Sequence, residues 1–260
     1  MAIDKIFPNP TVIKVIFQIR FPNLFFIQDR IGTLQSKIME RFPDSELLIK
    51  TQFTVGEIIG PEDKFENVFR THRDKFMEGQ SASAIKSWRF KSENNVILNI
   101  SSDSLDLSSE THKSYDKESG NSFRDIIEFT INNFLDVTNI PIILRIGLRY
   151  IDKCPFPEDS KIFKSYYNSV FPFSRFKIED TKDMNFRIIV KRKETFLRYM
   201  ERKVVIDDKP YLILDYDSYA EKIKSNNYLK ITDNLHENIA NEYEKTIKEP
   251  IYEIMNKKEE

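Results

Sequence analysis

Two stretches of this chain, more than a hundred residues apart, follow the same pattern. Residues 96–105 and 210–219 each run from an apolar strand into a polar Asp-Ser corner, and each precedes a polar loop and a long amphipathic helix. Upstream of each lies a β-rich segment with one arginine in an aromatic setting, Arg20 in the first case and Arg149 in the second. This repetition predicts two like halves that pack around a pseudo-twofold axis as one compact unit.

The predicted halves are residues 1–139 and 140–260, and each combines a strand, a helix, several antiparallel strands and a longer helix. Short strands in hairpin succession together with long helices define the α+β class. We expect the helices to pack on one face of a curved antiparallel sheet, with two separate sheets as the alternative. Hydrophobic periodicity and turn residues predict strands at residues 11–21, 50–59, 85–91, 96–101, 105–109, 142–150, 175–179, 186–191, 196–206 and 212–217, and helices at residues 26–42, 122–136, 161–170 and 233–255.

Two of the predicted helices carry signals for where they start or break. Ser122 is a suitable N-cap, and Asp125 supplies an acidic side chain three residues later. Pro250 lies inside the last predicted helix, and proline removes a backbone donor and clashes with the preceding turn. We therefore expect Pro250 to kink that helix or to end its regular part.

The composition excludes several classes of protein. With 40 basic and 41 acidic residues the net charge is −1, which argues against a surface that is wholly a nucleic-acid or membrane footprint but leaves room for a local basic patch. Cys154 is the only cysteine and there are three histidines, so neither an intrachain disulfide nor a metal site built on cysteine or histidine is expected. No secretory signal or membrane-spanning apolar run is recognisable. These features predict a cytoplasmic protein without a cofactor.

The segment Gly147-Leu148-Arg149-Tyr150-Ile151-Asp152 resembles the signature of a sporadically distributed prokaryotic family of uncharacterised proteins of about this length. Family patterns often have Asn where this chain has Asp152. The resemblance implies a protein without an established enzymatic activity that occurs among mobile or defence genes. It extends to residues 20–22, 98–105, 115–123, 214–217 and 235–236.

The repeated arginines and the nearby aspartates are the candidate ligand-binding residues. Arg20 and Arg149 could project into a shared cleft and hold an anionic group through bidentate hydrogen bonds. The alternative is a structural ion pair, with Asp103 or Asp217 as the partner. Asp215 and Asp217 lie two residues apart and therefore on one face of a strand, so a magnesium site is a further, weaker hypothesis.

The most basic part of the chain, residues 187–203, is a candidate nucleic-acid-binding hairpin. Phe186, Phe196 and Tyr199 are interleaved with its cations, and single-stranded nucleic acid binds where cations meet phosphates and rings meet bases. The alternative is a solvated hairpin whose aromatic residues face the core, which the alternation favours for Phe196. The cations are Arg187, Lys191, Arg192, Lys193, Arg198, Arg202 and Lys203.

No nucleophile elbow, phosphate loop, dinucleotide fingerprint or zinc-protease motif occurs, so no catalytic residue is predicted. We predict a non-enzymatic interaction or assembly protein that binds a protein partner or forms a homo-oligomer. It would act as an accessory or regulatory component of an antiviral defence or toxin-linked system. The alternative is a nucleic-acid-binding protein that uses residues 187–203, and a hydrolase built on the repeated Arg and Asp residues is a distant third.

Overall fold

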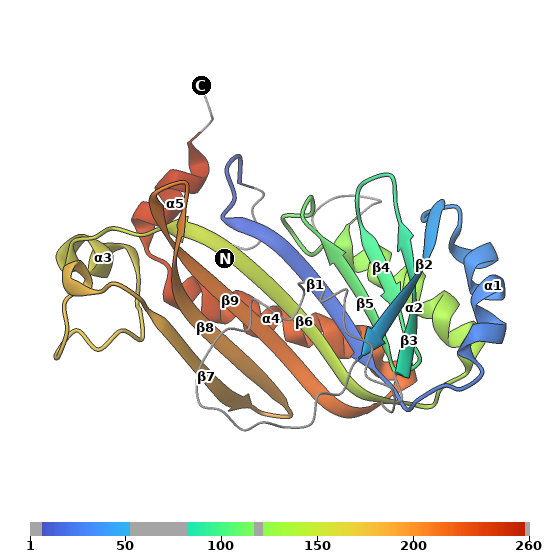
Figure 1. Cartoon of the computed structure of the whole chain (residues 1–260). Helices are drawn as coiled ribbons and strands as arrows, with labels where there is room; N and C mark the ends of the chain where they lie inside the picture. Colours follow the sequence, from blue (N-terminus) through green and yellow to red (C-terminus); the bar gives the residue numbers. More distant parts are fainter. Residues whose placement is uncertain (1–6, 53–82, 117–121, 258–260) are drawn as a thin grey trace, which may run out of the picture.

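In the computed structural model of this chain, residues 7–52, 83–116 and 122–257 are described. These residues form a mixed α+β fold with an open, nine-stranded antiparallel sheet and five α-helices (Figure 1). The α+β class and the antiparallel sheet are thereby confirmed. The elements are β1 (Val12–Arg20), α1 (Ile27–Ile38), β2 (Asp44–Gln52), β3 (Ser83–Lys91), β4 (Ile97–Ile100), β5 (Ser104–Ser109), α2 (Phe123–Thr138), β6 (Ile142–Pro155), α3 (Ser160–Tyr166), the 3-10 turn η2 (Ile178–Asp180), β7 (Asn185–Arg192), β8 (Thr195–Ile206), β9 (Lys209–Lys224), the 3-10 turn η3 (Ser225–Asn227), α4 (Tyr228–Thr246) and α5 (Glu249–Asn256).

The order of strands across the sheet is β2-β3-β4-β5-β1-β6-β9-β8-β7. The first strand of the chain therefore lies near the centre, where it pairs with β5 on one side and with β6 on the other. All of these pairings are antiparallel, and β6 in turn pairs with β9 along most of its length. One sheet thus contains the strands of both predicted halves, rather than two separate sheets.

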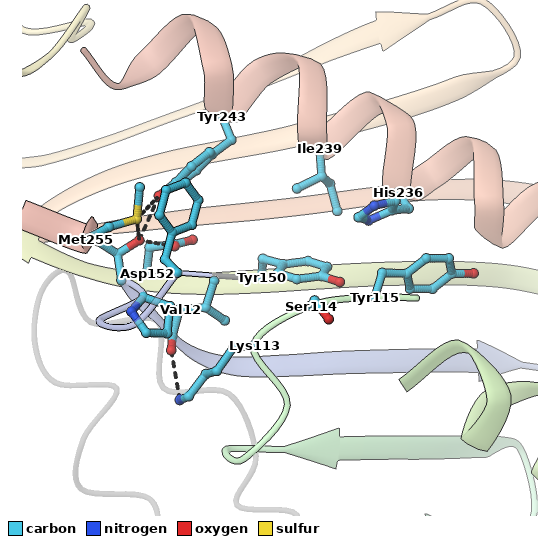
Figure 2. Close-up of a pocket in the computed structure, with 13 residues that line it drawn as sticks. Val12, Lys113, Ser114, Tyr115, Tyr150, Asp152, His236, Ile239, Tyr243 and Met255 are labelled. Carbon is cyan, nitrogen blue, oxygen red and sulfur yellow. Dashed lines mark hydrogen bonds between the residues drawn. The ribbon is translucent and has the colours of Figure 1, made fainter. Parts of the chain in front are cut away.

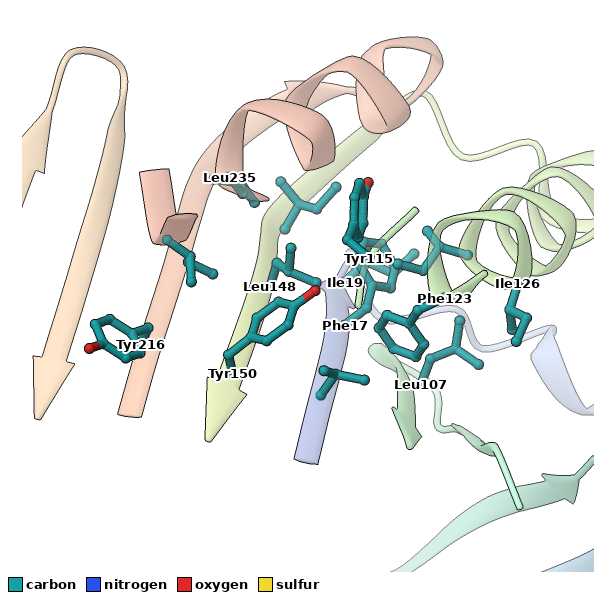
Figure 3. Packing of buried hydrophobic residues seen from close by; sticks show 14 of the residues in the cluster. Phe17, Ile19, Leu107, Tyr115, Phe123, Ile126, Leu148, Tyr150, Tyr216 and Leu235 are labelled. Carbon is teal, nitrogen blue, oxygen red and sulfur yellow. The ribbon is translucent and has the colours of Figure 1, made fainter. Parts of the chain in front are cut away.

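The core lies on one face of the central strands, where every second side chain is apolar and buried. Phe17 of β1 and Leu148 of β6 are completely buried there, as expected for every second residue of a strand with one face in the core. Figure 3 shows them facing Leu235 of α4 and Phe123 of α2. Both long helices therefore contribute to the same apolar cluster.

The local signals at the helix ends have different outcomes. The predicted N-cap is confirmed, because the Ser122 hydroxyl accepts a hydrogen bond from the Asp125 amide at 3.1 Å and the Asp125 carboxylate accepts one from the Ser122 amide at 3.3 Å. The last predicted helix is two helices, α4 and α5. They are separated at Ile247, whose extended backbone pairs with Tyr167, and Pro250 lies in the first turn of α5, where its missing N–H costs nothing.

Two strand predictions are wrong in place or kind. Residues 175–179 do not form a strand, because Ile178 begins a 3-10 turn whose amide donates to the Ser160 hydroxyl at 3.0 Å. The strand expected at 50–59 begins earlier, as β2, and residues 53–59 lie outside the described residues.

The two stretches that suggested a duplication do not take equivalent places in the sheet. Residues 210–219 lie in β9, next to the central strand β6. Residues 96–105 comprise β4 and the start of β5, and it is β5 that lies next to β1. The likeness of the two stretches reflects a shared strand-and-corner pattern rather than corresponding positions.

Candidate anion-binding site

The central strands turn a polar set of side chains away from the apolar core. We call this side of the sheet the outer face and define it by Gln18 of β1, Arg149 of β6 and Asp217 of β9. The strand register places Asp217 beside Arg149 and Arg20 beside Arg145. The period of two that buries Phe17 and Leu148 therefore also gathers these polar residues on the opposite side.

An open cleft of about 430 Å³ lies on the outer face. Five arginines line it, and we call it the arginine cleft. Because the arginines come from β1, β6, β7 and β8, strands of both halves contribute to it. The arginines are Arg20, Arg145, Arg149, Arg187 and Arg198.

Asp217 is the centre of an ion-pair network in the arginine cleft. Both of its carboxylate oxygens accept hydrogen bonds from Nη2 of Arg145, at 3.0 Å each, and Oδ2 lies 2.6 Å from Nη2 of Arg198. Only 3% of Asp217 is exposed, whereas the two arginine side chains stay 22% and 33% exposed. A single buried carboxylate thus holds two guanidinium groups with part of their surfaces turned to solvent.

Arg149 forms a separate ion pair with Asp215. Its Nε and Nη2 donate to the two carboxylate oxygens at 2.7 and 2.5 Å, which is the bidentate geometry typical of strong arginine–carboxylate pairs. The hydrogen bond to Asp215 raises the pKa of Arg149 above its ordinary value, so the guanidinium stays charged. The structural partner of Arg149 is therefore Asp215, neither Asp103 nor Asp217.

The glycine in the signature segment makes room for an arginine. A Cβ atom at Gly147 would lie 2.7 Å from Nη1 of Arg145, because that side chain folds across the glycine. There its Nη1 donates to Gln18 Oε1 at 3.1 Å, and its guanidinium carbon lies 4.6 Å from the centre of the Tyr219 ring. Gly147 thus lets Arg145 reach Asp217 across the sheet.

An aromatic pair adjoins the arginines on the outer face. Phe196 and Tyr219 are cross-strand neighbours whose rings stack, with centroids 5.2 Å apart and planes inclined by 20°. Leu197 and Tyr199 fill the core instead, at 1% and 3% exposure. The expectation that Phe196 faces the core is therefore wrong, because the alternation places it with Arg198.

The seven cations of residues 187–203 do not form one surface. Arg187 and Arg198 line the arginine cleft. Lys191 lies on the same face of β7 as Arg187, and Arg202 lies on the same face of β8 as Arg198. Arg192 instead pairs with Glu242 of α4 at 2.9 Å, Lys203 pairs with Glu158 at 3.3 Å, and Lys193 lies in the hairpin turn with φ 55°.

Four polar or charged residues that line the cleft were not predicted from the sequence: Gln18, Arg145, Tyr219 and Glu221. The Gln18 amide donates to Asp106, and burial raises the pKa of Asp106 although this hydrogen bond and Arg20 oppose the effect. Arg145 could have been found because it lies an even number of residues from Arg149 on one strand, so both point to the same face. The same reasoning applies to Tyr219 and Asp217. Among the described residues, no group of three or more His, Cys, Asp or Glu could hold a metal ion.

No family model, curated protein or solved structure matches this chain significantly. The resemblance to a prokaryotic family therefore stays a prediction. Within residues 7–52, 83–116 and 122–257, no helix is long and apolar enough to cross a membrane.

Proposed function

We propose that this protein is a non-enzymatic binding protein that holds single-stranded nucleic acid on the outer face of its sheet. The observation that carries the proposal is that five arginines and Tyr219 line one open cleft, and that the Tyr219 ring stacks on Phe196 next to it. Guanidinium groups bind phosphates, and exposed rings stack with bases of any sequence. Bases are available for such stacking in a single strand, whereas a duplex hides them.

The charges in the arginine cleft leave positive potential for a ligand. Five arginines and two carboxylates, Asp217 and Glu221, line the cleft, and Asp217 alone pairs with both Arg145 and Arg198. Arg20 and Arg187 are exposed, and no carboxylate of the described residues lies within 4.0 Å of their side-chain nitrogens. Cations that are not committed to ion pairs are the ones that can bind phosphate and release its counterions.

The arrangement of the arginines suits an extended strand that crosses the sheet. Arg187 on β7 and Arg20 on β1 are separated by three strands. At about 4.8 Å per strand, β7 and β1 lie about 19 Å apart, and the register offsets Arg187 from Arg20 further along the strand direction. This distance corresponds to a few nucleotides, which is a usual site size for a β-sheet that binds single strands.

The test is fluorescence anisotropy with a labelled, single-stranded oligothymidine and with the matching duplex. We expect binding to the single strand that weakens as salt increases. In Arg20→Gln and Arg187→Gln, the slope of log K against log salt should fall by about one each, because each variant removes one phosphate contact. Lys193→Gln, in the turn of the same hairpin but outside the cleft, is the matched control and should bind as the wild type does. Equal slopes in all four proteins, or no binding at all, would overturn the proposal.

A second candidate is the assembly protein, which the exposed edges of the sheet favour. The edge strand β2 exposes Leu47 and Ile49 at 53% and 60%, and the opposite edge β7 exposes Ile188 at 41%. Apolar edge strands readily pair with another chain. Sedimentation velocity would show a homo-oligomer that Leu47→Lys or Ile188→Lys dissociates, and a monomer at all concentrations would refute this candidate.

We also propose that the chain arose by tandem duplication and that α2 and α4 lie on one face of a curved sheet. The topology supports this, since in each half the last strand of the meander returns to pair with the first strand and a long helix follows. The role as an accessory of a defence system rests on the family resemblance alone, and the cytoplasmic location rests on the composition.

A further inference from the structure

A second, smaller cavity lies on the core side of the sheet, away from the arginine cleft. It has a volume of about 50 Å³ and is lined by β6, the loop after β5, α4 and α5 (Figure 2). Asp152, Tyr243 and Met255 lie at one end, Tyr115 and His236 lie at the other, and Tyr150 lies between them. A cavity of this size admits a ligand of a few non-hydrogen atoms.

The acidic end of the cavity has an unusual charge. Asp152 is 1% exposed, and its Oδ1 accepts a hydrogen bond from the Thr11 hydroxyl at 2.8 Å. No basic side chain of the described residues forms an ion pair with it. Burial raises the pKa of Asp152 to about 7, although the Thr11 hydrogen bond and the charge of Lys113 oppose the effect, so the ionised carboxylate is only partly compensated. A cation inside the cavity would complete the compensation.

The middle of the cavity offers a second polar group. Ser114 is 7% exposed, and its hydroxyl has no hydrogen-bond partner within the described part of the chain. Figure 2 shows Ser114 beside Tyr150, away from the Asp152 end. A buried hydroxyl without a partner is costly, so a ligand that bonds it gains affinity.

The walls of the cavity are aromatic. The rings of Tyr115 and His236 stack with centroids 4.4 Å apart, and Tyr150 lies 6.0 Å from the same imidazole. The faces of tyrosine rings attract organic cations, most strongly where water is excluded. We propose that this cavity binds a small amino alcohol, with its ammonium group at Asp152, its carbon atoms along the tyrosine rings and its hydroxyl at Ser114.

Lys113 also lines the cavity and opposes a cation there. Its ammonium donates to the backbone carbonyls of Val12 and Glu110, at 2.9 and 2.8 Å, and Figure 2 shows it directed toward Val12. Burial lowers the pKa of Lys113. Loss of Lys113 also raises the pKa of Asp152, so the comparison belongs at a pH where that carboxyl is ionised. There, because like charges repel, Lys113→Met should bind the ligand several-fold more tightly, an effect that a purely structural role would not produce.

The experiment is ligand-observed saturation-transfer NMR on the full chain with ethanolammonium chloride at constant ionic strength. Affinity in the millimolar range is expected, because binding energy is limited per ligand atom. Three small molecules separate the contributions. Ethylene glycol, the neutral isostere, and tetramethylammonium, which is too bulky, should show no transfer. Ethylammonium, which lacks the hydroxyl, should bind several-fold more weakly.

Variants and pH complete the test. Asp152→Asn should abolish the transfer, and Ser114→Ala should remove the preference for ethanolammonium over ethylammonium. Lowering the pH from about 8 to about 5 should weaken binding at least tenfold, because little of the carboxyl remains ionised. Circular dichroism confirms that each variant folds, and if Asp152→Asn does not, the Ser114→Ala and Lys113→Met results decide. The proposal is overturned if the wild type shows no transfer or if folded Asp152→Asn shows the same transfer.

Discussion

The buried carboxyl of Asp152 should make the stability of this protein depend on pH. In an unfolded chain its pKa has the ordinary value of 3.8, whereas burial raises it to about 7 in the folded protein, although the hydrogen bond from Thr11 opposes this. Between these pH values the folded protein keeps a proton that the unfolded chain releases. The free energy of unfolding therefore falls as the pH rises, and this stabilisation is complete below about pH 4 and lost above about pH 7.

The size of the effect follows from the two pKa values. At about 1.36 kcal/mol per pKa unit, the loss amounts to about 4 kcal/mol. Asp152→Asn removes it, because asparagine is neutral at every pH and keeps an oxygen that can accept the Thr11 hydrogen bond at 2.8 Å. The variant should be within about 1 kcal/mol of the wild type at about pH 4.5 and be more stable by about 4 kcal/mol at about pH 8.

Urea denaturation from mildly acidic to mildly alkaline pH is the assay. Burial also raises the pKa values of Asp106 and Glu201, but both residues are present in wild type and variant, so the difference between the two curves isolates Asp152. Asp207→Asn, in the exposed turn between β8 and β9, removes a charge at the surface and is the control. Parallel curves for wild type and Asp152→Asn would refute the reasoning.

Three further substitutions probe other parts of the molecule. Gly147→Ala should displace the flexible end of Arg145 and weaken oligonucleotide binding. The free energy of unfolding in urea should fall by no more than about 1 kcal/mol, and a larger loss would mean that the Arg145 side chain cannot move. Glu201→Ala should cost about 2 to 4 kcal/mol in urea, because the buried carboxylate accepts hydrogen bonds from the Ser169 hydroxyl, the Tyr199 hydroxyl and a backbone amide. Phe17→Ala should cost about 3 to 5 kcal/mol and lower the melting temperature by calorimetry, and an unchanged melting temperature would contradict its central position.

Local rules predicted the parts of the fold that depend on neighbouring residues. The capping box of Ser122 and Asp125 and the periodicity of α2 are contained in one short segment, and the prediction was confirmed. A break in the last helix was predicted at Pro250, but it lies at Ile247, before that proline, and the apolar spacing continues through it. Ile247 has an extended backbone and forms a β-bridge with Tyr167, and this long-range contact cannot be predicted from the spacing of apolar residues along the chain.

The site was predicted in its residue types but not in its pairs. Arg20, Arg149 and Asp217 do lie on one face, because parity along a strand is a local property. Which aspartate Arg149 binds depends on the side-chain conformations around it: Asp217 is its cross-strand neighbour but pairs with the guanidinium of Arg145, and Arg149 pairs with Asp215. The guanidinium of Arg145 lies across Gly147, in space that a side chain at that position would occupy. This contact is evident from the structure and could not be predicted from the spacing of the two residues.

The position of β1 in the sheet has a consequence for how the chain can be divided. The predicted boundary between the two halves lies near residue 139, yet backbone hydrogen bonds between β1 and β6 join the two halves. A fragment that ends there would leave one side of an apolar strand without its partner, an invitation to pair with another copy. During synthesis β1 can pair with β5 first, and its other edge has no partner until β6 has been made. Because β1 belongs to the first half and β6 to the second, neither half has a complete set of strand pairings without the other.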